Sequence, residues 1–413
     1  MNELKKALNL WQGIGLLSTS LLGTGIFAVP AIVALSAGSA GLWAWPLLLF
    51  CVLPIAICFA KLGKYYPHAG GVAYFISRAF NPQLGRITGW VFLSVIPFGL
   101  PAALYIATGF LHALFLFSPH VELLIQVITL LLIWCVGLFG AGASGWIQSL
   151  IAVLIIGLVL VICFAASPPV LAVTWPALSG VSSSVILSAF AVMFWCFVGL
   201  EAFVHLASEF KRPERDFSPA LLIGLLIAGF IYWAATAAVV YYAPSDATAT
   251  TALPKIVQQL FGQKALWTFC IIGYLACFAS INIYMQSFAR LIWSQMSLDY
   301  PQSILARLSK QQSPINALSL VILLCLCSLT LLHFLNIPLG HLLAYANGVF
   351  VLIYLLAMLS AIKLLKHTSK LLAILSAFIC LGLLVVIGYK SLYALFIFTV
   401  LWMLTLKKSR AQK

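Results

Sequence analysis

Long apolar segments dominate this chain of 413 residues and restrict the folds that it can adopt. Hydrophobic residues make up 64% of the sequence and charged residues only 7%. About 20 apolar residues can cross a bilayer as an α-helix, which satisfies its own backbone hydrogen bonds there. We therefore predict an all-α polytopic membrane protein with about twelve transmembrane helices. The predicted spans are residues 11–37, 40–60, 84–117, 121–140, 146–166, 184–208, 218–243, 264–296, 315–335, 339–363, 370–388 and 391–406.

The formal net charge of +14 is distributed unevenly along the chain. With twelve spans, all of the 22 lysines and arginines except Lys255, Lys264 and Lys390 fall in loops and termini on one side of the membrane. Because cytoplasmic loops carry an excess of basic residues, both termini are predicted to lie in the cytoplasm. This distribution accounts for the charge without a nucleic-acid partner, and the lipid bilayer is the predicted environment.

The connections between the predicted spans are short, so residues 1–413 are predicted to form a single transmembrane domain. The first apolar run continues into a full span without a small-residue cleavage site, so no cleavable signal peptide is expected. The ten cysteines all lie in apolar segments, and no Cys-x-x-Cys pair occurs. They are therefore expected to be packing residues, and no metal, redox or other cofactor site is predicted.

Two connections carry additional features. The inward loop 61–86 mixes tyrosine and phenylalanine with basic residues. It predicts either an ordinary basic loop or a short helix that lies partly in the membrane interface. The longest outward connection, residues 243–264, contains Thr and Ala and is long enough to cover an entrance.

Two spans contain residues that interrupt helices. In the first span, Gly23 and Gly25 flank Thr24 near the middle of the membrane, and in the sixth span Gly199 lies two residues before Glu201. These are corresponding positions in two successive groups of five spans. Interrupted segments at matching positions predict a transporter binding site between two inverted repeats. The repeats would be residues 11–166 and 184–363, followed by two additional helices in 370–406, although the two halves show no residue-level similarity.

Such interruptions have a specific chemistry. Unwinding frees N–H and C=O groups that lipid cannot satisfy, so they are tolerated where they line a cavity. The N–H groups at the start of a half-helix attract a carboxylate, and exposed carbonyls attract an ammonium group. An amino acid carries both groups, so the segment Gly23–Gly25 is predicted to help bind one. The alternative is that this Gly-x-Gly pattern only allows close packing of helices.

Glu201 is a carboxylate well inside an apolar segment, where it needs a partner, protonation or a water-filled cavity. It is predicted either to carry or sense a proton or to be a permanently protonated structural acid, because burial disfavours the charged form. His205 lies one helical turn further and either exchanges protons with Glu201 or packs as a hydrogen-bonded residue. Asn282, Gln286 and Asn347 are amides in apolar spans, expected to contact either the substrate or neighbouring helices.

Several motifs occur in an order typical of one transporter family. Residues 23–30 read Gly-Thr-Gly-Ile-Phe-Ala-Val-Pro, and residues 197–201 read Phe-Val-Gly-Leu-Glu. The other matching segments are 69–74, 89–90, 209–216 and 287–301. Together they resemble the amino acid–polyamine–organocation (APC) transporter superfamily over most of the chain. Within it, the chain is most similar to the bacterial exporters of L-methionine and branched-chain amino acids.

The resemblance implies a five-plus-five inverted-repeat fold in the bacterial cytoplasmic membrane, with broken first and sixth helices and alternating access between them. It implies that Thr24, Gly25 and Ile26, beside Gly23, hold the substrate carboxylate. The ammonium group would meet the carbonyls around Trp195, Cys196 and Val198, and Trp195 would also serve as an aromatic gate. Glu201 would take part in proton-dependent gating. The implied function is export of methionine, leucine, isoleucine and valine, with proton antiport as the preferred energy source.

Other functions stay open at this point. An importer or exchanger would share the same fold and site. Span 146–166 has no lysine or arginine, which casts doubt on a coupling scheme with a lysine there. A membrane-embedded enzyme would need clustered acids, histidines or metal ligands, and a channel would need rings of pore-lining groups. Neither pattern is visible, so a carrier rather than an enzyme is predicted.

Overall fold

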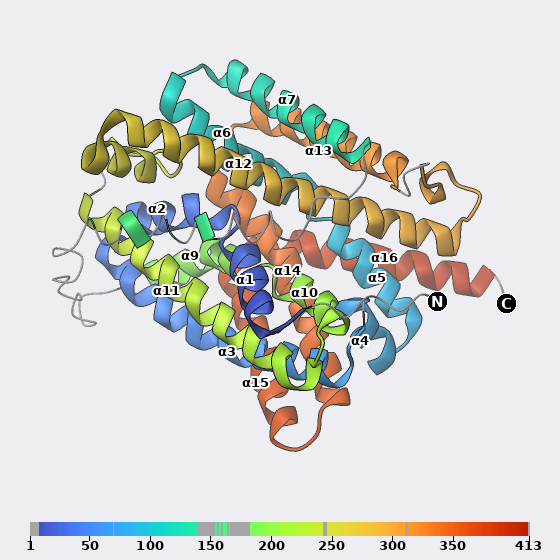
Figure 1. The fold of residues 1–413 in the computed structure, drawn as a ribbon. Helices are drawn as coiled ribbons and strands as arrows, with labels where there is room; N and C mark the ends of the chain where they lie inside the picture. The colour runs from blue at the N-terminus through green and yellow to red at the C-terminus, as the bar shows by residue number, and fades with distance from the viewer. Residues whose placement is uncertain are drawn as a thin grey trace.

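The computed structural model describes residues 8–68, 70–138, 182–242, 246–309 and 313–411, with a few residues between 153 and 165. These residues form an all-helical bundle without a β-strand (Figure 1). The helices are α1 (Leu10–Leu22), α2 (Gly25–Ala37), α3 (Gly41–Tyr65), α4 (Gly71–Ala79), α5 (Pro82–Leu93), α6 (Ile96–Phe115), α7 (Pro119–Leu138), α9 (Ser183–Met193), α10 (Leu200–Val204), α11 (Ser218–Tyr242), α12 (Ala252–Asp299), α13 (Ile315–Leu335), α14 (Leu339–Leu364), α15 (Thr368–Ile387) and α16 (Ser391–Ala411).

Length and composition make the chain a multi-pass membrane protein. Within the described residues, nine helical segments are long and apolar enough to cross a membrane. Two of them, Gly25–Tyr65 and Thr368–Thr405, join segments that the sequence predicts as separate spans. The predicted span 146–166 lies mostly outside the described residues. Helices suit this environment because each satisfies its own backbone hydrogen bonds in lipid.

The bundle has a buried centre and an apolar outside. Helix α14 runs through the middle and is buried along most of its length, whereas α7 and α13 lie along one side (Figure 1). Apolar side chains such as Leu131 on α7 and Leu323 on α13 are exposed on the surface. In water such a surface would be unfavourable, but in a bilayer lipid tails cover it.

The two long connections contain helices. Helix α4 lies inside the predicted inward loop, so this segment is not an extended loop. In the outward connection, residues 252–261 already belong to α12, which kinks at Gly262 where φ is +81°. The outward loop is therefore shorter than the sequence predicts.

The N-terminal segment is tied to the connection after α10. The N–H of Leu8 donates to the carbonyl of Glu209 at 3.0 Å, and the N–H of Lys211 donates to the carbonyl of Leu8 at 2.9 Å. Nearby, the rings of Phe203, Phe210 and Phe217 pack on one another, and Phe203 stacks on Phe217. This cluster fixes the end of α1 nearest the N-terminus against the end of the sixth predicted span.

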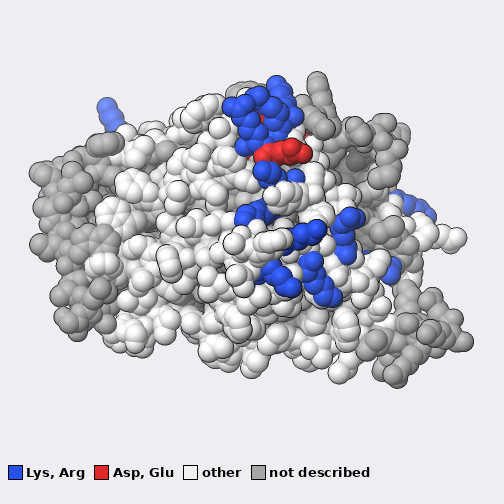
Figure 2. Space-filling model, turned by 90° about the horizontal axis from the view of Figure 1, so that it is seen from below, with Lys and Arg blue, Asp and Glu red and all other residues white. Residues whose placement is uncertain are grey.

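On the face of the molecule drawn in Figure 2, most lysine and arginine side chains lie close together. Figure 2 shows them concentrated in one region of this face, while a wide neighbouring region has neither acidic nor basic residues. The uneven charge along the sequence is therefore also uneven in space. Such a separation is expected of a protein whose basic loops lie on one side of a membrane.

Candidate functional site

The first predicted interruption is present between α1 and α2. Helix α1 ends at Leu22, Gly23 has a φ of +24°, and α2 begins at Gly25. The hydroxyl of Tyr232 on α11 donates to the carbonyls of Leu21 at 2.8 Å and Leu22 at 3.2 Å. The N–H groups at the start of α2 have no acceptor within their own helix. The Tyr232 side chain thus stabilises the end of α1, and the start of α2 presents backbone N–H donors.

The second interruption separates α9 from α10. After α9 the chain forms a 3₁₀ turn, Phe194–Phe197, and Val198 is extended with φ −70° and ψ 127°. Gly199 has a φ of +125°, a backbone conformation that residues other than glycine rarely adopt. A Cβ atom at Gly199 would lie 2.7 Å from the hydroxyl of Ser20, so glycine also permits the approach of α1. The sequence therefore places glycine where conformation and packing both require it.

Helix α14 holds this second break in place. The amide nitrogen of Asn347 donates to the carbonyls of Ala191 at 2.8 Å and Val192 at 3.3 Å, at the end of α9. The hydroxyl of Tyr354 lies 3.0 Å from the carbonyl of Phe197. Asn347 therefore contacts a neighbouring helix, which is one of the two alternatives predicted from the sequence. These bonds satisfy carbonyls that the interrupted helix leaves without partners.

The two breaks meet. The indole N–H of Trp195 lies 3.4 Å from the hydroxyl of Thr24 and donates to it. A Cβ atom at Gly25 would lie 2.5 Å from the hydroxyl of Tyr232, 3.3 Å from Trp195 Cδ1 and 3.4 Å from Cys196 Sγ. Glycine at this position therefore permits the close approach of α11 and of the 3₁₀ turn to the start of α2. Thr24, Gly25, Trp195 and Cys196 lie together where the two breaks meet.

The surroundings of Trp195 are apolar. Its ring lies 6.4 Å from the ring of Phe350 on α14, at an interplanar angle of 77°. Gly99 on α6 faces both Trp195 and Ala346, because a Cβ atom there would lie 3.6 Å and 3.7 Å from them. The Trp195 ring is therefore packed against a small and an aromatic residue of neighbouring helices. Ile26 and Val198 are buried beside the two breaks.

Glu201 lies just beyond the second break and is 3% exposed. Its Oε2 atom accepts hydrogen bonds from the N–H of Gly199 at 2.9 Å and from the hydroxyl of Tyr354. Its Oε1 atom has no hydrogen-bond donor among the described protein groups. The carboxyl group is thus bonded directly to the backbone of the break. A change in its charge would act on the conformation of Gly199.

His205 lies in a different environment from Glu201. It is exposed, and its ring packs against Gly71 at the start of α4, where a Cβ atom would lie 2.4 Å from the imidazole. The 3₁₀ turn His205–Glu209 follows α10 directly. His205 therefore packs against α4, whereas the Glu201 carboxylate is hydrogen-bonded to Tyr354.

Sequence reasoning missed Tyr232 and Tyr354. Both are fully buried, and both donate hydroxyl hydrogen bonds to the interrupted helices. A buried tyrosine hydroxyl usually finds a partner, so a tyrosine deep in an apolar span is a signal for such a contact. The partner, however, lies in another helix and cannot be identified from the tyrosine alone.

Known proteins resemble this chain over almost its whole length. The model of the amino acid permease family matches residues 8–409. The chain is 53% identical to the L-methionine/branched-chain amino acid exporter YjeH of Escherichia coli (strain K12), over 99% of this chain and 98% of that protein.

More distant relatives are named for cationic or for large neutral substrates. The chain is 25% identical to the cadaverine/lysine antiporter of Escherichia coli (strain K12), over 68% of this chain and 64% of that protein. It is 27% identical to the human large neutral amino acids transporter small subunit 2, over 85% of this chain and 68% of that protein. The predicted resemblance is confirmed, and the chain is a member of the amino acid permease family, a family of transporters rather than enzymes.

Proposed function

We propose that this protein exports neutral hydrophobic L-amino acids from the cytoplasm, with methionine, leucine, isoleucine and valine as substrates. The observation that carries the proposal is the contact between Trp195 and Thr24, which joins the two helix breaks beside Gly25. The high identity to an exporter with these amino acids in its name supports the substrate class and direction.

The backbone of the substrate binds to the two breaks. The N–H groups of Gly25 and Ile26 and the hydroxyl of Thr24 bind the carboxylate, because the start of a half-helix carries partial positive charge. The carbonyls of Trp195, Cys196 and Val198 bind the ammonium group. These groups recognise every amino acid alike, so the side-chain pocket determines specificity.

The residues proposed to receive the substrate side chain are apolar. Phe350, Gly99 and Ala346 surround Trp195, and none of them offers a charge or a side-chain hydrogen bond. A cationic side chain such as that of lysine would lose its hydration without a compensating partner. We therefore infer a preference for aliphatic and thioether side chains, in contrast with the cadaverine/lysine antiporter.

The proposed transport cycle is alternating access. Twelve spans form two inverted repeats, residues 11–166 and 184–363, and α15 and α16 provide the two additional helices. Both termini lie in the cytoplasm, and the membrane is the bacterial inner membrane. Interrupted helices at matching positions, together with the asymmetry in basic residues, support this topology.

Proton antiport is the proposed energy source, and Glu201 is the proposed proton carrier. Its carboxylate accepts the N–H of Gly199 and the hydroxyl of Tyr354, and a protonated carboxyl is a weaker acceptor. Protonation would loosen the second break, so proton binding and substrate binding would both act on the same short segment. His205, which is exposed beside α4, would exchange protons with Glu201.

Two assays test substrate and coupling separately. In proteoliposomes loaded with unlabelled leucine and without a pH gradient, radiolabelled leucine and methionine should accumulate by counterflow, and lysine should not. With leucine-loaded vesicles, net efflux should accelerate when the outside is made more acidic. Failure of counterflow would reject the substrate class, whereas counterflow without any effect of the gradient would reject proton coupling.

Glu201→Gln tests the proton carrier, because glutamine keeps the shape but cannot titrate. The variant should keep counterflow and lose the acceleration of efflux by the pH gradient. Asp246→Asn is the matched control. Lys255 donates a hydrogen bond to Asp246 and keeps the pKa of this carboxyl below its usual range, so Asp246 stays charged from about pH 5 to about pH 8. Unchanged gradient dependence in Glu201→Gln would exclude Glu201 as the carrier.

A further inference from the structure

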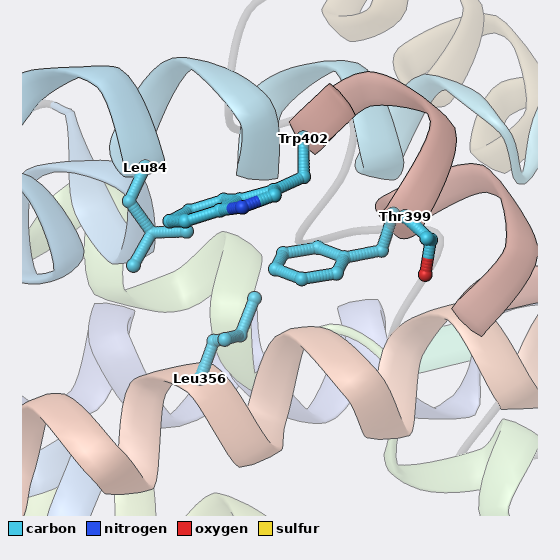
Figure 3. A pocket seen from close by; sticks show the side chains of 5 residues that line it. Leu84, Leu356, Thr399 and Trp402 are labelled. Atoms are coloured by element: carbon cyan, nitrogen blue, oxygen red, sulfur yellow. The ribbon is translucent and has the colours of Figure 1, made fainter. Parts of the chain in front are cut away.

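A small apolar groove lies at the junction of α5, α14 and α16, and its lining includes no residue of the two helix breaks. Figure 3 shows the side chains that line it, with Trp402 directed toward Leu84 and Leu356 on the opposite side. Its volume is about 250 Å³. The lining residues are Leu84, Leu356, Phe398, Thr399 and Trp402.

The groove offers almost no polar contact. The hydroxyl of Thr399 donates to the carbonyl of Leu395 at 2.8 Å, so its donor is used within α16. The rings of Phe398 and Trp402 stack at 6.1 Å, and Trp402 is 37% exposed. A partly exposed tryptophan on a transmembrane helix is typical of the region where lipid headgroups meet acyl chains.

Positive charge lies beyond one end of the groove. Lys363 is seven residues after Leu356 on α14, which places it two turns and about 10 Å further on the same face. The Lys363 ammonium lies 4.0 Å from the centre of the Phe80 ring, and Phe80 is four residues before Leu84. On both the α14 side and the α5 side, the chain therefore runs from the groove toward Lys363.

A second cation is held beside Lys363. The Arg78 guanidinium lies 5.4 Å from the centre of the Tyr66 ring, and the Tyr66 hydroxyl donates to the carbonyl of Leu364 at 3.1 Å. Arg78 and Lys363 are both exposed, and neither forms an ion pair with a carboxylate in the described parts of the chain. Aromatic rings thus support two cations that have no anionic partner among these residues.

We propose that this groove binds one acyl chain of an anionic phospholipid, and that Lys363 and Arg78 bind its phosphate. Apolar lining selects a hydrocarbon chain, since each buried methylene group adds favourable free energy. The two cations select a negative headgroup, and they belong to the basic loops predicted on the cytoplasmic side. The occupant is therefore a lipid from the cytoplasmic leaflet, and this proposal does not depend on the transported substrate.

The binding is tested with the purified full-length chain in neutral detergent, by native mass spectrometry with phosphatidylglycerol and phosphatidylcholine of identical acyl chains. The wild type should bind phosphatidylglycerol about tenfold more tightly. The double variant Lys363→Gln/Arg78→Gln should lose this preference, because its affinity for phosphatidylglycerol should fall more than its affinity for phosphatidylcholine, whose choline offsets the phosphate charge. Lys264→Gln, which removes an exposed lysine from the opposite predicted side, should behave as the wild type.

A groove-filling variant tests the acyl-chain site. Thr399→Trp adds a large ring to an exposed residue of the lining, so it should weaken the binding of both lipids. Counterflow of leucine checks that each variant is folded. A preference for phosphatidylglycerol that persists in the double variant would overturn the headgroup site. Unchanged lipid binding in Thr399→Trp would overturn the groove.

Discussion

At the scale of single residues, the breaks depend on a few buried polar side chains. Tyr232 hydrogen-bonds the end of α1, Asn347 the end of α9, and Tyr354 both a carbonyl and the carboxylate of Glu201. A carbonyl left without a donor in an apolar interior loses its hydration without compensation. These side chains therefore make the interrupted helices tolerable in the bundle centre.

Tyr232→Phe tests this function of the hydroxyl. The variant leaves the carbonyls of Leu21 and Leu22 without this donor, at an expected cost of about 1–3 kcal/mol in stability. We expect a lower thermal unfolding midpoint in detergent and slower leucine counterflow. Tyr241→Phe is the control, because Tyr241 lies on the same helix and is 42% exposed. Equal midpoints for the two variants would contradict a stabilising hydroxyl at the first break.

Residue types alone indicated part of the candidate site. Gly23, Gly199 and Glu201 are conspicuous in apolar spans because each is costly there without a reason. The tyrosines gave a weaker signal, since tyrosine is common in membrane proteins at the headgroup level. The hydrogen bonds of Tyr232 and Tyr354 became visible only when helices distant in the sequence were packed together.

At the scale of elements, α1 is held against the chain that follows α10. Gly13 lets this happen, because a Cβ atom there would lie 2.5 Å from the Phe210 ring and 2.9 Å from the Cβ atom of Ala220. Phe210 is fully buried among other aromatic rings and has little room to move. Gly15, on the same helix, faces open space, since a Cβ atom there would meet nothing within 4 Å.

Gly13→Ala and Gly15→Ala add the same methyl group two residues apart. Overpacking at Gly13 should destabilise the protein by about 1–3 kcal/mol, whereas Gly15→Ala should be neutral or stabilising by up to about 1 kcal/mol. Thermal unfolding in detergent measures both, and counterflow should slow only in Gly13→Ala. If the two variants unfold at the same temperature, the close approach of α1 to Phe210 is not required for stability.

At the scale of the whole molecule, membrane topology follows from charge and span number. With twelve spans, Lys264 faces the outside and Lys366 the cytoplasm, and both side chains are exposed. This arrangement is a prediction, since the nine membrane-length segments of the described residues do not establish the number of crossings.

Cysteine labelling tests the topology directly. Cys135 and Cys327, which are exposed, are first replaced by alanine to lower the background. In intact cells, a membrane-impermeant maleimide should then modify Lys264→Cys, and it should modify Lys366→Cys only after the cells are permeabilised. Labelling of both positions from outside, or of neither before permeabilisation, would refute the proposed orientation.

The sequence by itself determined the membrane location, most of the span positions, the sites of both helix breaks and the family. Those properties depend on local signals: apolar length, glycine in a helix, and short motifs. The tertiary structure alone decided which groups stabilise the breaks and where the apolar groove between α5, α14 and α16 lies. Tyr232 and Leu21 are 211 residues apart, and Tyr354 and Glu201 are 153 residues apart. No local pattern encodes such pairs, because they form only when packing brings separate helices into contact.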